Sequence, residues 1–65
     1  MSLAKVIEVI AEGAWFEQAM ENAAKEASSS LRGVSSIYAE NIKALVEDGK
    51  ITSYRVNAKV TFVID

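Results

Sequence analysis

The stretch VEDGKITSYRVNAKVTFVID, residues 46–65, alternates between apolar and polar side chains over most of its length. The apolar positions are Tyr54, Val56, Ala58, Val60, Phe62 and Ile64. The polar positions between them are Ser53, Arg55, Asn57, Lys59 and Thr61. A period of two is typical of a strand that buries one face. Since the alternation lasts about a dozen residues, which is long for a strand, it predicts the central strand of a small sheet.

A tight turn is predicted immediately before this strand. Residues 47–50 read EDGK, and the Asp48-Gly49 pair in them tolerates positive φ angles. Apolar residues flank the segment on both sides, which is the strongest short-range signal for a hairpin. We therefore expect residues 34–46 and the final strand to be antiparallel neighbours.

The remaining segments predict two strands and one helix. Residues 4–11, AKVIEVIA, are rich in β-branched residues and apolar on both faces, which indicates a strand. Over residues 15–32 the apolar side chains recur with helical spacing, and Gly33 follows where a left-handed residue is expected to end the helix. Residues 34–46 return to strand character, with a bulge or bend predicted near residues 41–45, where the alternation slips.

These elements predict an α+β fold. Their order along the chain is strand, helix, strand, hairpin and strand, and a right-handed helical crossover from the first strand to the second can skip a position in the sheet. The last strand then fits between the other two. We therefore expect a single domain over residues 1–65, a β-α-β-β unit whose three-stranded antiparallel sheet has the order 1-3-2 and wraps around one helix.

The composition indicates self-association. The 65 residues are 51% hydrophobic and 25% charged, and they include no cysteine and no histidine. A chain this short buries only about 60% of the surface that its unfolded form exposes, and without cysteine neither disulfides nor thiolate metal sites can stabilise it. We therefore expect a homo-oligomer, in which other copies cover the second apolar face of residues 4–11.

The same composition argues against several classes of function. The net charge of −2 and the lack of a basic cluster argue against a nucleic-acid partner. No spacing pairs a nucleophile with a base, and histidine is absent, so we expect no enzymatic activity. The short apolar runs are interrupted by Lys5, Glu8 and Glu12, which argues against a membrane span or a signal peptide and predicts a cytoplasmic protein.

The helix segment WFEQAMENAAKEAS, which leads to LRGV, and the closing segment VEDGKITSYRVNAKVTF together resemble the dodecin family. The resemblance spans residues 5–62 and is most specific in the V-E-D-G-K turn and the following Y-x-V-x-x-K-V-x-F strand. It implies a hollow homododecamer that is not an enzyme and that, in most members, stores or sequesters flavins in pairs at subunit interfaces.

The resemblance also implies a flavin site, whose two characteristic residues differ in this chain. Flavin-binding dodecins stack a tryptophan of the second strand on the isoalloxazine ring and hydrogen-bond its polar edge with a glutamine of the third strand; the matching positions are Ser36 and Arg55. A serine has no π-face for stacking, whereas Tyr38, two residues further on the same strand face, can partly replace the tryptophan. We therefore expect ligand contacts from Ser36, Tyr38 and Arg55, a degenerate flavin site and an unknown ligand.

Other side chains leave alternatives open. Arg55 and Lys59 share one strand face, and they can either meet a phosphate or carboxylate in a central cavity or pair with Glu8 or Glu40 across the sheet. Trp15 opens the helix and is predicted to pack against the sheet edge or a neighbouring subunit.

Two acidic residues of the turn suggest a second function. Glu47 and Asp48 are candidate ligands for calcium or magnesium because such cations need clustered oxygens, although the Asp suits the hairpin without any metal. Two functions therefore stay open. The first is binding and storage of a small ligand, and the second is a structural or calcium-linked assembly with no organic ligand.

Overall fold

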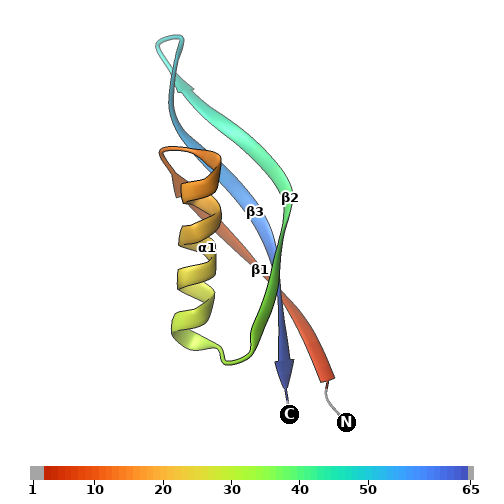
Figure 1. Cartoon of the computed structure of the whole chain (residues 1–65). Coiled ribbons are helices and arrows are strands. Elements are labelled where there is room, and N and C mark those ends of the chain that lie inside the picture. Colours follow the sequence, from red (N-terminus) through yellow and green to blue (C-terminus); the bar gives the residue numbers. More distant parts are fainter. Residues whose placement is uncertain (1–2, 65) are drawn as a thin grey trace.

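The computed structural model describes residues 3–64 of the chain. Its elements are β1 (Leu3–Gly13), α1 (Phe16–Ser30), β2 (Val34–Glu47) and β3 (Lys50–Ile64). The three strands form an antiparallel sheet in the order β1-β3-β2, and α1 lies against one face of this sheet (Figure 1). The predicted β-α-β-β fold with the strand order 1-3-2 is confirmed.

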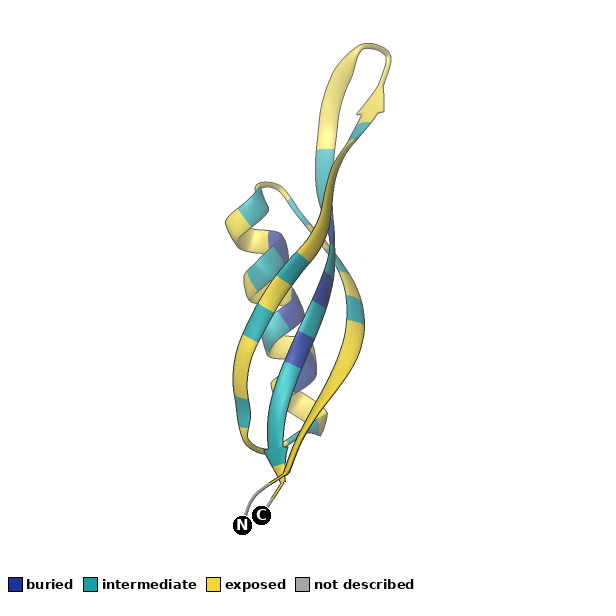
Figure 2. Ribbon diagram, turned by 90° about the vertical axis from the view of Figure 1, so that its right-hand side faces the viewer, coloured by how far each residue is buried: buried dark blue, intermediate teal, exposed yellow. Residues whose placement is uncertain are grey.

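The central strand β3 has one face toward α1 and one face away from it. The face of the sheet that α1 covers is called the inner face below, and the opposite face is called the outer face. Val56, Ala58 and Val60 of the inner face are fully buried, and the ribbon in Figure 2 has its buried, dark blue segments on the central strand and on the helix. The alternation of β3 therefore gives the buried face that it predicts.

The helix packs closely on the sheet through alanines. Ala19, Ala23 and Ala27 are spaced four residues apart, which places them on one side of α1, and all three are buried. Ala19 and Ala23 belong to one core cluster with Val56 and Ala58. Because an alanine side chain is a single methyl group, the backbone of α1 comes close to β3, and little volume is left for a larger residue on either side.

The helix is shorter than predicted, since α1 covers Phe16–Ser30 instead of residues 15–32. Leu31 already has an extended backbone, with φ −124° and ψ 147°. The hydroxyl of Ser29 donates a hydrogen bond of 2.7 Å to the carbonyl oxygen of Glu26, and such local bonds compete with helical backbone pairing. Serine is also a poor helix former, so the helix ends two residues early. No helix within residues 3–64 is long and apolar enough to cross a membrane.

Gly33 is left-handed as expected, with φ +74°, but it does not end the helix. Its conformation belongs to the turn that leads into β2. The carbonyl oxygen of Gly33 accepts a hydrogen bond of 2.9 Å from the N–H of Val63, and a Cβ added to Gly33 would lie 2.5 Å from the carbonyl oxygen of Val63. Gly33 therefore allows two backbone segments far apart in sequence to touch.

The first two strands are longer than predicted, and β2 is irregular at several points. β1 covers Leu3–Gly13 rather than residues 4–11. The register of β2 on β3 shifts at Val34/Ser36, Ala39/Asn41 and Leu45/Val46. The bulge or bend predicted near residues 41–45 is confirmed, because two of these shifts flank that stretch, whereas residues 41–45 themselves pair regularly with β3. The extra residue Glu40 re-phases the alternation just before them.

The β2-β3 hairpin is confirmed as predicted from the Asp-Gly pair. Glu47 pairs with Lys50, and the two turn residues between them, Asp48 and Gly49, have φ angles of +51° and +75°. Positive φ at both positions is typical of the turn whose twist matches that of hairpin strands. The hairpin projects beyond the end of α1 (Figures 1 and 2).

Candidate functional site

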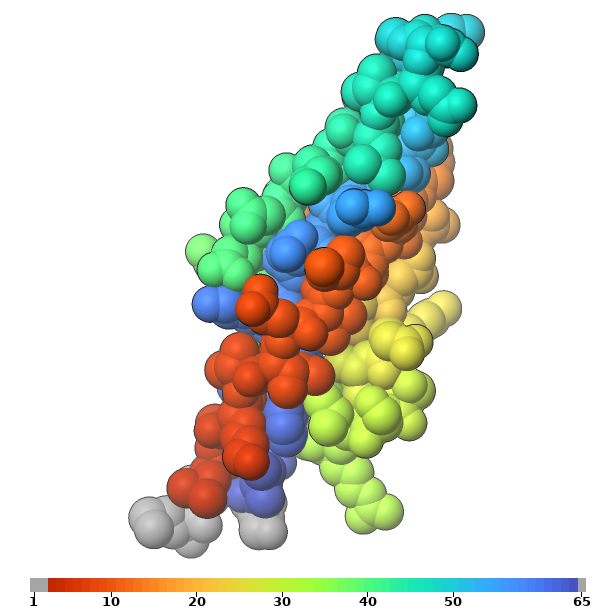
Figure 3. Space-filling view, turned by 180° about the vertical axis from the view of Figure 1, so that it is seen from behind, coloured from red at the N-terminus to blue at the C-terminus, as the bar shows by residue number. Residues whose placement is uncertain are grey.

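The outer face of the sheet carries mostly polar side chains, with a few apolar ones, in rows that cross the three strands. In Figure 3 the molecule is seen from behind, with β1 in red to orange, atoms of β3 in blue and β2 in green to cyan. The rows set by the strand register are Glu12–Arg55–Lys43, Ile10–Asn57–Asn41, Glu8–Lys59–Tyr38 and Val6–Thr61–Ser36. The predicted ligand residues Ser36, Tyr38 and Arg55 therefore all lie on the outer face.

Arg55 is held by a carboxylate on the neighbouring strand β1. Its Nε and Nη2 atoms donate hydrogen bonds of 3.0 and 2.6 Å to the same carboxylate oxygen, Oε2 of Glu12. The side chains of Arg55 and Glu12 are 37% and 47% exposed, so the ion pair is in partial contact with solvent and stabilises the fold by at most about 1 kcal/mol. Its main effect is to orient the guanidinium group toward β1.

Glu12 was missed by the sequence-based prediction, which ended the first strand at Ala11. Because β1 continues to Gly13, Glu12 is placed opposite Arg55 in the strand register. The signal that could have found it is the alternation Glu8, Ile10, Glu12, which continues the outer face of β1 to its end. Arg55 therefore forms an ion pair across the sheet, as one of its two alternatives predicted. Its partner is Glu12 and not the predicted Glu8 or Glu40.

Lys59 pairs with Glu40, one of the two partners predicted for it. The Nζ atom of Lys59 lies 3.3 Å from Oε1 of Glu40. Glu8, the other predicted partner, lies directly across from Lys59 in the strand register. These charges lie on the outer face, where partly exposed pairs contribute little to stability and mainly determine which groups a ligand meets.

Ser36 and Arg55 do not come together within one chain. Ser36 lies opposite Thr61 of β3, and the strand from Arg55 to Thr61 is about 20 Å long at about 3.3 Å per residue. Tyr38, opposite Lys59, lies between them and is 66% exposed. A ligand much shorter than about 20 Å therefore cannot touch both Ser36 and Arg55 of the same chain.

The sequence matches one protein family over nearly its whole length. Residues 3–65 match the family model described as Dodecin. The chain belongs to the dodecin family. Dodecins are not enzymes, so the prediction of a protein without catalytic activity is confirmed.

Two solved structures are similar to this dodecin chain over almost its whole length. One, of a protein from Thermus thermophilus, is 20% identical in sequence with a TM-score of 0.92, and the match covers 100% of this chain and 97% of that chain. The other, of dodecin from Streptomyces coelicolor, is 26% identical with a TM-score of 0.91 and covers 98% and 93% of the two chains. A comparison with curated proteins finds no match.

The candidate metal ligands of this dodecin lie in its projecting turn. The positive φ of Asp48 is the conformation that the turn requires. Within residues 3–64, no group of three or more acidic, histidine or cysteine side chains gathers into an arrangement that could hold a metal ion. Glu47 and Asp48 alone offer few of the six to eight oxygens, approximately, that calcium takes, so metal binding there stays a prediction.

Trp15 is largely exposed in one chain. The residue is 64% exposed, and its extended backbone precedes the first residue of α1. Most of its surface is therefore left uncovered by its own chain. The contact with a neighbouring subunit stays a prediction.

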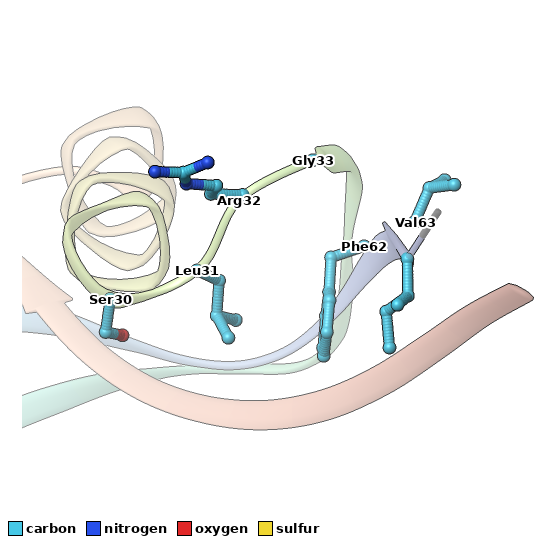
Figure 4. Close-up of a pocket in the computed structure, with 7 residues that line it drawn as sticks. Ser30, Leu31, Arg32, Gly33, Phe62 and Val63 are labelled. Atoms are coloured by element: carbon cyan, nitrogen blue, oxygen red, sulfur yellow. The ribbon is translucent and has the colours of Figure 1, made fainter.

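A hollow of about 510 Å³ opens where α1 leads into β2, on the opposite end of the dodecin chain from the hairpin. It is lined by Ser30, Leu31, Arg32, Gly33, Phe62, Val63 and Ile64. Leu31 and Phe62 extend to one side of the chain, and Arg32 extends away from them (Figure 4). None of the predicted ligand residues lines this hollow, so it is not part of the candidate site on the outer face.

Proposed function

We propose that this dodecin binds and stores a small planar ligand, without catalysis, as a hollow homododecamer whose ligand sites lie between copies of the chain. The observation that carries the proposal is the amount of apolar surface that one chain leaves exposed. The exposed large apolar side chains are Leu3, Val6, Ile7, Ile10, Trp15, Tyr38, Ile42, Val46, Ile51 and Ile64. Surface of this kind on a small protein marks sites of contact with other molecules.

The buried core of one chain is small beside this exposed surface. The buried residues are Ala19, Ala23, Ala27, Val56, Ala58 and Val60. Burial of a valine contributes about 1.5–3 kcal/mol and that of an alanine methyl less, so this core by itself supports only marginal stability. Further copies supply the missing burial, because they cover the apolar side chains on both faces of the sheet and along the projecting hairpin.

The ligand site is proposed at a contact between copies because of the register. Ser36 and Arg55 lie about 20 Å apart along the sheet of one chain, whereas a flat heterocycle is only about half as long. Ser36 or Tyr38 of one copy and Arg55 of another can meet one ligand between them. Tyr38 supports this arrangement because its ring is exposed and can stack on a flat heterocycle.

The assembly is tested by light scattering of the purified chain. We expect a particle of about twelve times the 7.1 kDa mass of one chain. The variant Ile10→Lys replaces an apolar side chain that is 64% exposed in one chain, so it should leave an isolated chain almost unchanged. If other copies cover Ile10, the buried charge should instead dissociate the particle. A stable folded monomer of the unaltered protein would contradict the proposal.

Flavin binding is expected to increase when the stacking residue is restored. Ser36→Trp adds a large aromatic face, and stacking of a heterocycle on an aromatic side chain is worth about 1–3 kcal/mol, which corresponds to roughly 5- to 150-fold tighter binding. Titration of flavin fluorescence measures the change. Ser35→Trp is the matched control, because it makes the same substitution at the neighbouring position. If the Ser36→Trp protein binds flavin no more tightly than the Ser35→Trp protein, the proposed flavin site at Ser36 is contradicted.

A second candidate function is a protein shell that holds no organic ligand. The observation that favours it is Ser36 itself, since a serine leaves the stacking position without an aromatic face. A preparation that is colourless and takes up no flavin on soaking would support the shell. A chelator that then lowers the melting temperature would indicate a calcium-linked shell, whereas an unchanged melting temperature would indicate a shell held by protein contacts alone.

A further inference from the structure

We propose that Glu12 is a ligand-binding residue of this dodecin, and that Glu12 and Arg55 together recognise the imide edge of a planar heterocycle. This inference rests on the proposed function, since it concerns the same site. An imide edge is a row of carbonyl, N–H and carbonyl groups, so it needs a hydrogen-bond acceptor placed beside donors. The ion pair of Arg55 and Glu12 provides both kinds of group side by side.

The ion pair leaves one acceptor and several donors free. Both hydrogen bonds from Arg55 end on Oε2 of Glu12. Within residues 3–64, Oε1 of Glu12 and Nη1 of Arg55 take part in no hydrogen bond. On the outer face, the side chain of Arg55 is 37% exposed and that of Glu12 is 47% exposed. An incoming ligand therefore meets a carboxylate oxygen next to guanidinium N–H groups.

Arg55 by itself has the wrong chemistry for an imide. A guanidinium group only donates hydrogen bonds, so it would set N–H against the N–H of the imide. A glutamine amide, in contrast, both donates and accepts. The free oxygen of Glu12 supplies the missing acceptor, and the pair as a whole carries no net charge. A neutral heterocycle can therefore cover the pair without leaving a buried, uncompensated charge.

Neighbouring residues hold the ion pair in this orientation. Lys43 lies across from Arg55 on β2, and like charges directly opposite each other repel, which directs the guanidinium group toward Glu12 on β1. The backbone of Glu12 is fixed to the helix, because the side-chain amide of Asn22 donates a hydrogen bond of 2.8 Å to its carbonyl oxygen. The acceptor and donors thus stand on a strand end anchored to α1, which limits the cost of ordering them on binding.

The test compares riboflavin with 3-methylriboflavin, which carries a methyl group in place of the imide hydrogen. For the assembled protein we expect riboflavin to bind about tenfold more tightly, because the methylated ring leaves the Glu12 carboxylate without its hydrogen bond. Glu12→Ala should reduce this ratio to about one, and Glu12→Gln, which keeps an acceptor oxygen, should restore most of it. Glu8→Ala is the matched control: it removes a carboxylate from the same face of the same strand, and it should leave the ratio unchanged.

Each outcome separates this inference from the proposed function. Equal affinities of the unaltered protein for the two flavins would overturn the role of the imide edge while ligand binding itself stands. A ratio that survives Glu12→Ala, or that Glu8→Ala abolishes equally, would overturn the role of Glu12. Absence of riboflavin binding both to the unaltered protein and to Ser36→Trp would overturn the proposed function and the inference with it. If Glu12→Ala fails to assemble, Glu12→Gln tests the role of Glu12, and equal affinities of the unaltered protein for the two flavins would still overturn the inference.

Discussion

The variant Ala23→Leu is expected to lower the melting temperature of the protein by about 15 °C. Ala23 is fully buried between α1 and the sheet, in one cluster with Val56 and Ala58. A leucine side chain does not fit where an alanine methyl brings the helix close to β3, so α1 must shift or side chains must leave their preferred rotamers. Overpacking of this kind costs about 1–3 kcal/mol and occasionally more, which is a large part of the stability of so small a chain.

Thermal unfolding followed by circular dichroism measures this effect, with Ala24→Leu as the control. Ala24 is the next residue of the helix and is only partly buried, so the same change in side chain should cost much less there. Size-exclusion chromatography shows whether the assembly persists. Equal shifts for the two variants would contradict a tight contact between α1 and β3 at Ala23.

Gly33→Ala is expected to destabilise the protein by about 3 kcal/mol, because two costs combine at this position. The φ of Gly33 is +74°, a conformation that costs an alanine about 1–2 kcal/mol. The added Cβ would also lie 2.5 Å from the carbonyl oxygen of Val63. Relieving this contact moves the turn away from β3 and weakens the hydrogen bond between the Val63 N–H and the Gly33 carbonyl oxygen.

Gly49→Ala separates the two costs of the Gly33 variant. Gly49 has nearly the same φ, +75°, but a Cβ added to it meets no atom within 4 Å. This control should therefore lose only the conformational part, about 1 kcal/mol, in a chemical denaturation experiment. If Gly33→Ala proves no more destabilising than Gly49→Ala, the close approach of the turn to β3 plays no role in stability.

Local sequence patterns predicted the fold because each of them favours one backbone conformation. The alternation around Val56, Ala58 and Val60 predicted the buried face of the central strand, and these residues are fully buried. The Asp48-Gly49 pair predicted a turn with positive φ at both positions, as the structure has it. With a helical crossover between the first two strands, only a few topologies remain, and the observed order β1-β3-β2 is the expected one.

Element ends and bulges were predicted less well, because they depend on contacts between distant segments. The helix ends early where the Ser29 hydroxyl bonds to the backbone, and Gly33 is needed for its approach to Val63. The irregularity predicted near residues 41–45 takes the form of two register shifts that flank this stretch, at Ala39/Asn41 and at Leu45/Val46. In each case the sequence pattern shows that an irregularity is needed, whereas packing determines which residue takes it.

The candidate site shows the same division between sequence and tertiary structure. The sequence, through its resemblance to a family, offered Ser36 and Arg55 as candidate ligand residues, which stay predictions, and it contains no histidine or cysteine. Strand pairing alone determined that Glu12 holds Arg55 and that Ser36 lies about 20 Å from it along the sheet. The physical reason is that the identity of a side chain is a local property, whereas the strand register depends on the whole fold. Burial of the inner face of all three strands against one helix determines the register, and the register determines which residues of the outer face are neighbours.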